Sequence, residues 1–373
     1  MDKPLAGLKV LELARILAGP WAGQLLADLG AEVIKVERPG EGDDTRHWGP
    51  PFAEDGAAAY FHACNRGKKS VAIDLGTASG QEQVRALAAQ SDVLIENFKV
   101  GGLARYGLDH ASLAALNPGL IYCSITGFGQ TGPYAQRSGY DFIIQGMGGS
   151  MSLTGEPDGE PQKSGIAYAD LFTGLYSTVA ILAALRDRDR TGRGAHIDMA
   201  LLDTQVGVLA NQALNWIVSG EVPHRMGNGH ANLVPYQAFR VSDGEVIVAV
   251  GNDRQFARLC DILGLPGLAE DERFRTNAAR VVNRGVLIPI LEKAMLERSR
   301  RAFSAALEAA GIPAGPINAV DAVFADPQVV HRGMKLEGAL PGLASPIMID
   351  GKRQVAERRS PILDGDRDEV LGG

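Results

Sequence analysis

The segment 139–174 combines a carboxylate with a high density of glycine. Gly148 and Gly149 belong to the run GMGG at 146–149, and Asp170 follows further along the segment. Glycine lets backbone N–H groups approach a reacting centre closely, and such groups can stabilise an oxyanion. Asp170 stands at the start of an apolar helical pattern, so it is either a helix N-cap or a catalytic carboxylate. Residue types and spacing leave both roles open.

A second group of candidate ligands follows the predicted strands. In an open parallel sheet, ligands bind beyond the carboxyl ends of the strands. The residues expected there are Arg15, Ile16, Arg38, Ile73, Asn97 and Phe98. Guanidinium groups, an amide and an aromatic ring would suit a phosphorylated nucleotide whose base stacks. The alternative is that Arg15 and Arg38 are surface residues in solvated loops.

Short apolar runs alternate with helical patterns over the first 200 residues. Strands are predicted at 8–14, 31–37, 70–75, 92–98, 120–126 and 195–199, and helices at 21–29, 80–90 and 170–186. Strands rich in Val and Ile with helices between them indicate a parallel, doubly wound sheet. Segments 39–52 and 125–133 are rich in turn residues, and the first is predicted to be a polar surface loop.

The character of the chain changes near Gly220. A hairpin is predicted within 236–250 and helices from 253 to about 310. We therefore expect an α/β protein with an open parallel, Rossmann-like large domain over 1–200, to which 330–373 returns. A smaller α+β domain should cover 225–320, with linkers at 201–224 and 321–329.

Composition excludes several classes of protein. The 373 residues carry 37 Lys+Arg and 44 Asp+Glu, a net charge of −7 without a dense basic block, so no nucleic-acid partner is expected. Charges interrupt the N-terminal apolar stretch, and the apolar region 175–185 is too short to span a bilayer, so neither a signal peptide nor a membrane partner is expected. Three scattered cysteines indicate the cytoplasm, and the seven histidines show no HExxH or HxH metal pattern.

A nicotinamide dinucleotide site is the obvious rival for the end of the first strand. The turn that follows reads ARILAGPWAG, which lacks the GxGxxG spacing of such a site. The second strand does end in an acidic residue, Glu37, which a dehydrogenase would use for a ribose hydroxyl. Arg38 follows at once and suits an additional phosphate better, so the dinucleotide interpretation is weak.

Six short motifs, in order along the chain, resemble the class III CoA-transferases, the carnitine and bile-acid (CaiB/BaiF) type. They are LAGP at 17–20, LGAEVIKVERPG at 29–40, NRGKKS at 65–70, ENF at 96–98, SITGFG at 124–129 and ADL at 169–171. Each is weak evidence alone, but the ordered set covers nearly the whole chain. The resemblance implies an interlocked homodimer in which each chain threads through the other.

The resemblance also assigns roles to individual residues. Asp170 takes the place of the catalytic aspartate, which carries CoA as an aspartyl thioester. CoA is then a substrate and no cofactor is permanently bound. The CoA contacts implied by the resemblance are Ile16, Arg38, Ile73, Asn97, Phe98, Arg105 and Tyr140. Two positions depart from the family pattern: Leu17 replaces a glutamine of the formate–oxalate enzyme, and Ser138 replaces a lysine for which Arg137 could substitute.

Two alternative functions remain beside CoA transfer. The α-methylacyl-CoA racemases share the fold but need a base at the α-carbon, supplied by a histidine in a Gly-His-Asp sequence. This chain has Tyr140 there, between Gly139 and Asp141, and tyrosine is a poor base near neutral pH. A non-catalytic CoA-binding protein would tolerate the loss of Asp170, which this chain retains.

The segments 40–52, 122–133 and 234–239 look most like the succinyl-CoA:glutarate branch of the family, whose members exchange CoA among dicarboxylic acids. The expected partners are therefore an acyl-CoA, small carboxylic acids and a second copy of the chain. A second carboxylate needs a cationic or hydrogen-bonding anchor, for which Arg15, His230 and Asn232 are candidates. His230 lies where the family has a mobile loop; the alternative is a plain interdomain turn.

Overall fold

The computed structural model describes residues 3–338 and 342–372, and the chain forms two compact units. The first contains 1–150, 163–210 and 327–373, and the second contains 151–162 and 211–326. Segment 151–162, expected in the large domain, thus belongs to the second unit. Both predicted linkers contain helices. The first, 201–224, contains α8 (Leu201–Gly207) and α9 (Asn211–Ser219). The second, 321–329, overlaps α15 (Val320–Ala325) and α16 (Pro327–His331).

The first unit contains a six-stranded parallel sheet, which confirms the predicted mixed α/β class. Its strands are β1 (Lys9–Glu12), β2 (Glu32–Glu37), β3 (Lys68–Ala72), β4 (Val93–Glu96), β5 (Ile121–Thr126) and β6 (Ala195–Ala200). Their order is β3-β2-β1-β4-β5-β6, with Val10 opposite both Val33 and Val93. The order reverses direction at β1 and β4, the position at which such sheets form a crevice for ligands.

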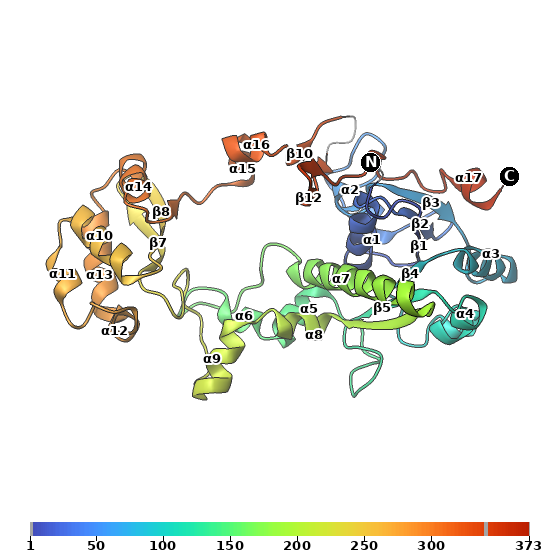
Figure 1. Cartoon of the computed structure of the whole chain (residues 1–373), viewed down its shortest axis with the longest axis horizontal. Coiled ribbons are helices and arrows are strands. Elements are labelled where there is room, and N and C mark those ends of the chain that lie inside the picture. The colour runs from blue at the N-terminus through green and yellow to red at the C-terminus, as the bar shows by residue number, and fades with distance from the viewer. Residues whose placement is uncertain (1–2, 339–341, 373) are drawn as a thin grey trace. The chain divides into compact units, whose positions relative to one another are not determined.

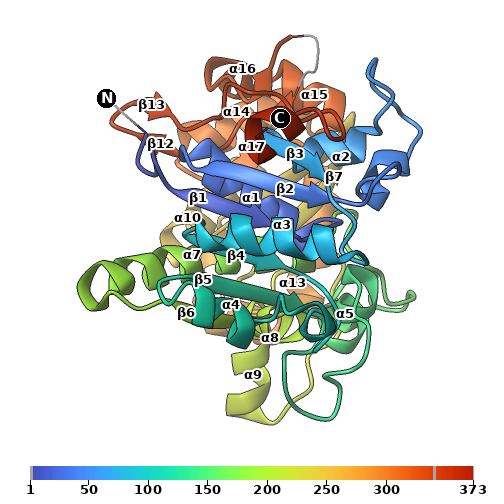
Figure 2. The ribbon, with the colours of Figure 1, turned by 90° about the vertical axis from the view of Figure 1, so that its right-hand side faces the viewer.

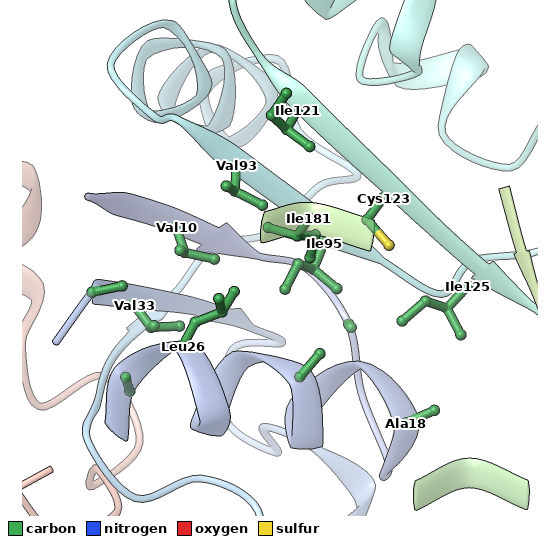
Figure 3. Packing of buried hydrophobic residues seen from close by; sticks show 14 of the residues in the cluster. Val10, Ala18, Leu26, Val33, Val93, Ile95, Ile121, Cys123, Ile125 and Ile181 are labelled. Carbon is green, nitrogen blue, oxygen red and sulfur yellow. The ribbon is translucent and has the colours of Figure 1, made fainter. Parts of the chain in front are cut away.

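Helices cover both faces of this sheet (Figures 1 and 2). On one face, α1 (Ala18–Asp28) and α7 (Tyr168–Thr191) bury Leu26 and Ile181 against Val10 and Ile95 (Figure 3). On the other face lie α3 (Ala78–Ala89) and α4 (His110–Leu116). The remaining elements of the unit are α2 (Ala59–Ala63), α5 (Asp141–Met147), α17 (Arg367–Leu371), the short strands β10 (Lys335–Leu336), β11 (Gly342–Leu343), β12 (Met348–Ile349) and β13 (Lys352–Arg353), and the 3-10 turns η1 (Asp44–His47) and η2 (Ala104–Tyr106).

The edge strand β3 is completed by the C-terminal segment. Ser70 donates its backbone N–H to the Asp366 carboxylate at 2.9 Å, and Ala72 donates its N–H to the Asp364 carboxylate at 2.7 Å. These side chains satisfy edge N–H groups that would otherwise face solvent. The strand also begins two residues earlier than the apolar pattern indicated, at Lys68, which is fully buried and paired with Glu12.

The prediction of a polar surface loop at 39–52 is wrong for its central part. Asp43 and Thr45 are fully buried and Arg46 is nearly so. Arg46 forms a two-pronged ion pair with Glu37, with N–O distances of 2.7 and 2.8 Å, and its guanidinium stacks on the ring of Phe61. Pairing and hydrogen bonding offset the cost of burying these charges, and the polarity of the sequence alone could not reveal the partners.

The second unit is an α+β structure with its own core. Its three-stranded antiparallel sheet, in the order β7-β8-β9, consists of β7 (Tyr236–Val241), β8 (Gly244–Ala249) and β9 (Ala314–Gly315). Phe239 and Val248 pack against Phe256 and Leu291. The helices are α10 (Asp253–Leu263), α11 (Gly267–Glu270), α12 (Asn277–Val282), α13 (Arg284–Met295) and α14 (Arg300–Ala309); α6 (Ser150–Leu153) lies at the boundary between the units.

Among the described residues, α7 alone has the length and apolarity of a membrane-spanning helix. Buried core helices of globular proteins meet the same criterion. The residues Thr173, Ser177 and Ile181 of α7 are buried inside the first unit, as expected for such a core helix.

Candidate functional site

A cavity of about 480 Å³ opens at the carboxyl end of the parallel sheet. Residues that follow β1, β4, β5 and β6 line it, together with the first turn of α7, as the topology predicts. The structure brings together these predicted site residues at its wall: Arg15, Ile16, Asn97, Phe98, Arg105, Tyr140 and Asp170. They come from segments up to 155 positions apart in the sequence, from Arg15 to Asp170.

Asp170 is the third residue of α7, so the alternative role of N-cap is wrong: the cap position is Ala167. The side chain of Asp141 serves that end of the helix instead, accepting the N–H groups of Ala169 at 2.9 Å and Asp170 at 3.4 Å. Burial, and secondly the negative charge of Asp141, raise the pKa of Asp170 to about 7. A carboxyl with a raised pKa in a cavity is a candidate for catalysis.

Cationic side chains line the same cavity as this carboxyl. Arg15, Lys99, Arg105 and Arg137 all line the cavity. The Arg137 guanidinium stacks over the ring of Tyr134, 4.5 Å from its centroid, and no ion pair of Arg137 occurs within residues 3–338 and 342–372. The sequence analysis named Arg137 only as a possible substitute for the lysine that Ser138 replaces, and it did not name Lys99. The cavity is therefore suited to an anionic ligand.

Arg38 does not line the cavity, but it shares a counter-ion with Arg15. The Asp44 carboxylate lies 2.6 Å from Nη1 of Arg15 and 3.3 Å from Nη2 of Arg38. One carboxylate thus holds together two guanidinium groups that follow adjacent strands. Asp44 was missed because its segment was interpreted as a solvated loop.

Asn97 fixes the backbone of the cavity wall. Its Oδ1 accepts the N–H of Arg15 at 2.9 Å, and its Nδ2 donates to the carbonyl of Arg15 at 2.6 Å. Both polar groups of the amide are therefore used to join the segment after β4 to the segment after β1. Contact between Asn97 and CoA stays a prediction.

Other predicted site residues lie away from the cavity. Ile73 is buried in the core between the sheet and α3. Gly148 and Gly149 end α5, where their N–H groups donate to the carbonyls of Ile144 and Gly146 at 2.7 and 3.4 Å. The role of these glycines in binding an oxyanion gains no support from this geometry, because both N–H groups already have partners.

His230 and Asn232 belong to the second unit, where they stabilise a turn. Nδ1 of His230 accepts the N–H groups of Asn232 and Leu233 at 3.0 and 3.1 Å. The Asn232 side chain accepts hydrogen bonds from Asn211 and Asn215, both at 3.2 Å. These bonds are consistent with the alternative of an interdomain turn and leave the substrate role untested.

The segment after β5 meets the segment before α5 backbone to backbone. A Cβ atom on Gly127 would lie 2.6 Å from Cα of Gly139 and 2.8 Å from its nitrogen. Real Cβ atoms do not approach backbone that closely, so both positions require glycine for packing. Gly127 lies in the motif SITGFG, so its presence was visible in the sequence. The sequence alone did not identify Gly139 as the residue that it contacts.

We expect Gly127→Ala to push these two segments apart and to raise KM for the ligand of the cavity at least about tenfold. Steady-state kinetics would measure this change. Gly207→Ala is the matched control, because no atom lies within 4 Å of its added Cβ, and its KM should stay within about twofold of the wild type. Equal KM values for both variants would contradict the inferred packing requirement.

A metal ion and a dinucleotide were the alternative ligands, and the structure shows how the residues that would bind them are placed. Across the described residues, no three His, Cys, Asp or Glu side chains are placed to hold a metal ion. Glu37, the acidic residue that a dinucleotide site would use, is buried and bonded to Arg46, Ser70 and the N–H of Asp43. Glu37 is therefore a structural residue.

Comparison with known proteins adds three findings. The sequence model of CoA-transferase family III matches residues 5–367. A succinate–glutarate CoA-transferase of Agrobacterium fabrum is 55% identical, over 99% of this chain and 95% of the relative, and the human succinyl-CoA:glutarate CoA-transferase is 44% identical, over 97% and 84%. A crystal structure of a CaiB/BaiF family protein from Brucella suis has a TM-score of 0.88 and 60% identity, covering 99% of this chain and 100% of that chain.

Proposed function

The chain belongs to CoA-transferase family III and is a CoA-transferase, and we propose that it moves CoA between dicarboxylic acids with Asp170 as its covalent carrier. The observation that carries the proposal is the placement of a partly buried carboxyl with a raised pKa in a cavity lined by four cations. The cations suit both the phosphates of CoA and the free carboxylate of a dicarboxylic acyl group. Succinyl-CoA and glutarate, the substrates in the name of the human relative, are the proposed pair.

In the proposed mechanism, a carboxylate oxygen of Asp170 attacks the thioester carbonyl of the donor. The C–S bond breaks, which leaves a mixed anhydride on Asp170 and a CoA thiolate. The thiolate attacks Cγ of Asp170, releases the donor acid as its carboxylate and forms an aspartyl-CoA thioester. The acceptor carboxylate then attacks Cγ and breaks its C–S bond, which expels the CoA thiolate and leaves a mixed anhydride between Asp170 and the acceptor. The thiolate attacks the acyl carbon of the acceptor in this anhydride, which forms the new acyl-CoA and releases Asp170 as its carboxylate.

Intact mass under acyl-CoA tests this mechanism directly. Incubation with succinyl-CoA should add the mass of CoA, less water, to the wild type, and hydroxylamine should remove the adduct. Asp170→Ala should show no adduct while it still binds CoA. A wild type that binds CoA and turns over without any adduct, with several acyl-CoAs, would contradict the covalent mechanism.

Activity should depend on pH because the nucleophile is the ionised form of Asp170. With the pKa of Asp170 at about 7, the ionised fraction falls about tenfold per pH unit below neutrality. We expect kcat/KM for succinyl-CoA to fall about a hundredfold from pH 8 to pH 5.

Asp141→Asn provides the contrast for this profile. Asparagine still accepts a hydrogen bond but removes the like charge, so the midpoint should move to lower pH. Rate profiles of both proteins, recorded with a saturating acceptor, would measure the difference. A wild-type rate that is flat between pH 5 and pH 8 would contradict the assigned role of the carboxylate.

Arg15 is the proposed anchor for the second carboxylate of the substrate. Its guanidinium lines the same cavity as Asp170, and its side chain is 43% exposed despite the pair with Asp44. Arg15→Gln should reduce the preference for glutarate over valerate, its monocarboxylic counterpart, by about ten- to a hundredfold in kcat/KM. If kcat/KM falls by the same factor for glutarate and for valerate, Arg15 is not the anchor of the second carboxylate.

The proposal includes an interlocked homodimer in the cytoplasm. Phe172, Leu175, Tyr176 and Val179 are exposed at helical spacing along α7, and an exposed apolar stripe of this kind is typical of an interface. The three free, buried cysteines suit a reducing compartment. Light scattering of the purified chain should give the mass of a dimer. A monomer that transfers CoA at the full rate would exclude the homodimer.

A further inference from the structure

The backbone of Ile16 adopts a conformation that isoleucine rarely takes. Its φ angle is +74°, in the left-handed region, where β-branched residues are strained. Ile16 lies at the wall of the cavity, between Arg15 and Leu17. Such a conformation persists only where neighbouring groups hold it.

The group that holds Ile16 is a carboxylate behind the cavity wall. The N–H of Ile16 donates to both oxygens of Asp43, at 3.3 Å each. Asp43 itself does not line the cavity. It can therefore influence a ligand through the backbone that it fixes.

Asp43 is in turn held as a charged group. Nζ of Lys35 lies 2.9 Å from Oδ2 of Asp43, and both side chains are fully buried. Thr45 donates its N–H and its hydroxyl to Oδ1 at 3.0 and 2.8 Å. Burial alone would raise the pKa of Asp43, but Lys35 and Thr45 lower it to about 2, so the carboxylate stays ionised at neutral pH.

A further layer supports this pair. Lys35 also donates to Glu12 at 3.1 Å, and Glu12 accepts from Lys68 at 2.9 Å. A Cβ atom on Gly23 would lie 1.9 Å from Oε2 of Glu12, so the glycine in α1 provides the space for this carboxylate. The buried network thus extends from α1 to the backbone of the cavity wall.

We propose that Asp43, held by Lys35, is a positioning residue that keeps Ile16 in its left-handed conformation and so shapes the wall of the cavity to which acyl-CoA binds. This inference rests on the proposed function of the cavity. Asp43 should affect the binding of acyl-CoA more than the chemical step. The N–H that it accepts belongs to Ile16 in the cavity wall, whereas the reacting carboxyl, Asp170, lies in the first turn of α7. The loss should therefore appear chiefly in KM for acyl-CoA.

The test is a double-mutant cycle between Asp43→Asn and Ile16→Gly in the full chain. Asparagine keeps the shape of the side chain, but it loses the negative charge that pairs with Lys35 and has one acceptor oxygen in place of the two that accept the N–H of Ile16. Glycine adopts positive φ without strain and does not need to be held. We expect Asp43→Asn to raise KM for succinyl-CoA at least about tenfold with kcat within about threefold. The double variant should match Ile16→Gly alone, so the two effects should not multiply.

Hydrogen exchange supplies a readout that is independent of activity. The amide of Ile16, followed in peptides that cover 13–18, should exchange at least about tenfold faster in Asp43→Asn than in the wild type. Asp28→Asn is the matched control, because Asp28 is a buried carboxylate paired with Arg66 at 2.7 Å and is remote from Ile16 in its contacts. It should lower stability without changing either the KM for succinyl-CoA or the exchange of 13–18.

Two results would overturn the inference. One is an unchanged KM and unchanged exchange in Asp43→Asn, while the wild type transfers CoA normally. The other is a full multiplication of the two effects in the double variant, which would mean that Asp43 acts on something other than Ile16. A wild type that neither binds nor transfers CoA would instead refute the proposed function and leave the exchange result to decide the structural role.

Discussion

Asp170→Asn should reduce kcat for CoA transfer at least about a thousandfold, because the amide cannot form the anhydride or the thioester. KM for acyl-CoA should change little, since the cations and backbone groups of the cavity remain. The measurement is transfer of CoA from succinyl-CoA to glutarate, with CoA binding followed by calorimetry. Residual transfer within tenfold of the wild type would exclude Asp170 as the carrier.

The same substitution should stabilise the protein at alkaline pH. The pKa of Asp170 is raised to about 7 in the folded chain, from 3.8, so the folded state prefers the protonated carboxyl. The contribution of Asp170 to the free energy of unfolding is therefore fully present below pH 3.8 and is lost as pH rises through about 7. Asparagine removes this dependence, so at pH 8 it should increase the free energy of unfolding by about 2–4 kcal/mol.

A carboxylate in the first turn of another helix supplies the control for this effect. Asp203 lies in the first turn of α8 and is exposed. Asp203→Asn should lower stability slightly, by about 0.3–1 kcal/mol, because it removes a favourable interaction with the helix dipole. Thermal unfolding at pH 8 should thus give opposite signs for the two variants. A loss of stability in Asp170→Asn at pH 8 would show that the ionised carboxylate of Asp170 does not destabilise the folded state.

Much of the parallel sheet could be predicted from sequence. Runs such as AEVIKVE at 31–37 and LIYCSIT at 120–126 are rich in β-branched residues and bounded by turns, and both form strands within one residue of the expected bounds. Parallel connectivity then places the ends of β1 and β4 together, which is why Arg15, Asn97 and Phe98 could be expected at one edge. Asp170 follows no strand, and its role was expected from the family resemblance. Side-chain roles such as the clamp by Asn97 depend on tertiary contacts.

The main failures concern buried charge. Asp43 and Arg46 lie in a stretch of turn residues and charges, which predicts solvent exposure when it is considered alone. Their partners, Lys35 and Glu37, belong to a strand whose polar residues would ordinarily face water. Pairing between a strand and a later turn is a tertiary event, and local pattern carries no information on it. Ile73 illustrates the reverse case, where a residue at a strand end enters the core and not the cavity.

The buried network under β1 leads to the second large effect. Glu12 is fully buried and is the shared counter-ion of Lys35 and Lys68, with N–O distances of 3.1 and 2.8 Å. Glu12→Gln leaves these two ammonium groups with one carboxylate, Asp43, in place of two. Removing one partner of a buried ion pair typically costs about 3–5 kcal/mol, so we expect a loss of that size in the free energy of unfolding at pH 7. Glu32→Gln is the matched control, since Glu32 pairs with Lys69 on the neighbouring strands but is 37% exposed, and should cost at most about 1 kcal/mol.

The pH dependence of the Glu12→Gln variant distinguishes lost charge compensation from lost packing. Burial lowers the pKa of Lys68, and the charge of Glu12 opposes that shift. Without Glu12, the pKa of Lys68 in the folded state should fall further below its unfolded value of 10.5, so the unfolded state binds more protons. Stability of the variant should then rise with pH between 7 and 10, more steeply than that of the wild type, as Lys68 becomes neutral. Denaturant unfolding at pH 7 and pH 10 would measure this recovery, and an equal loss at both values would assign the effect to packing and hydrogen bonding alone.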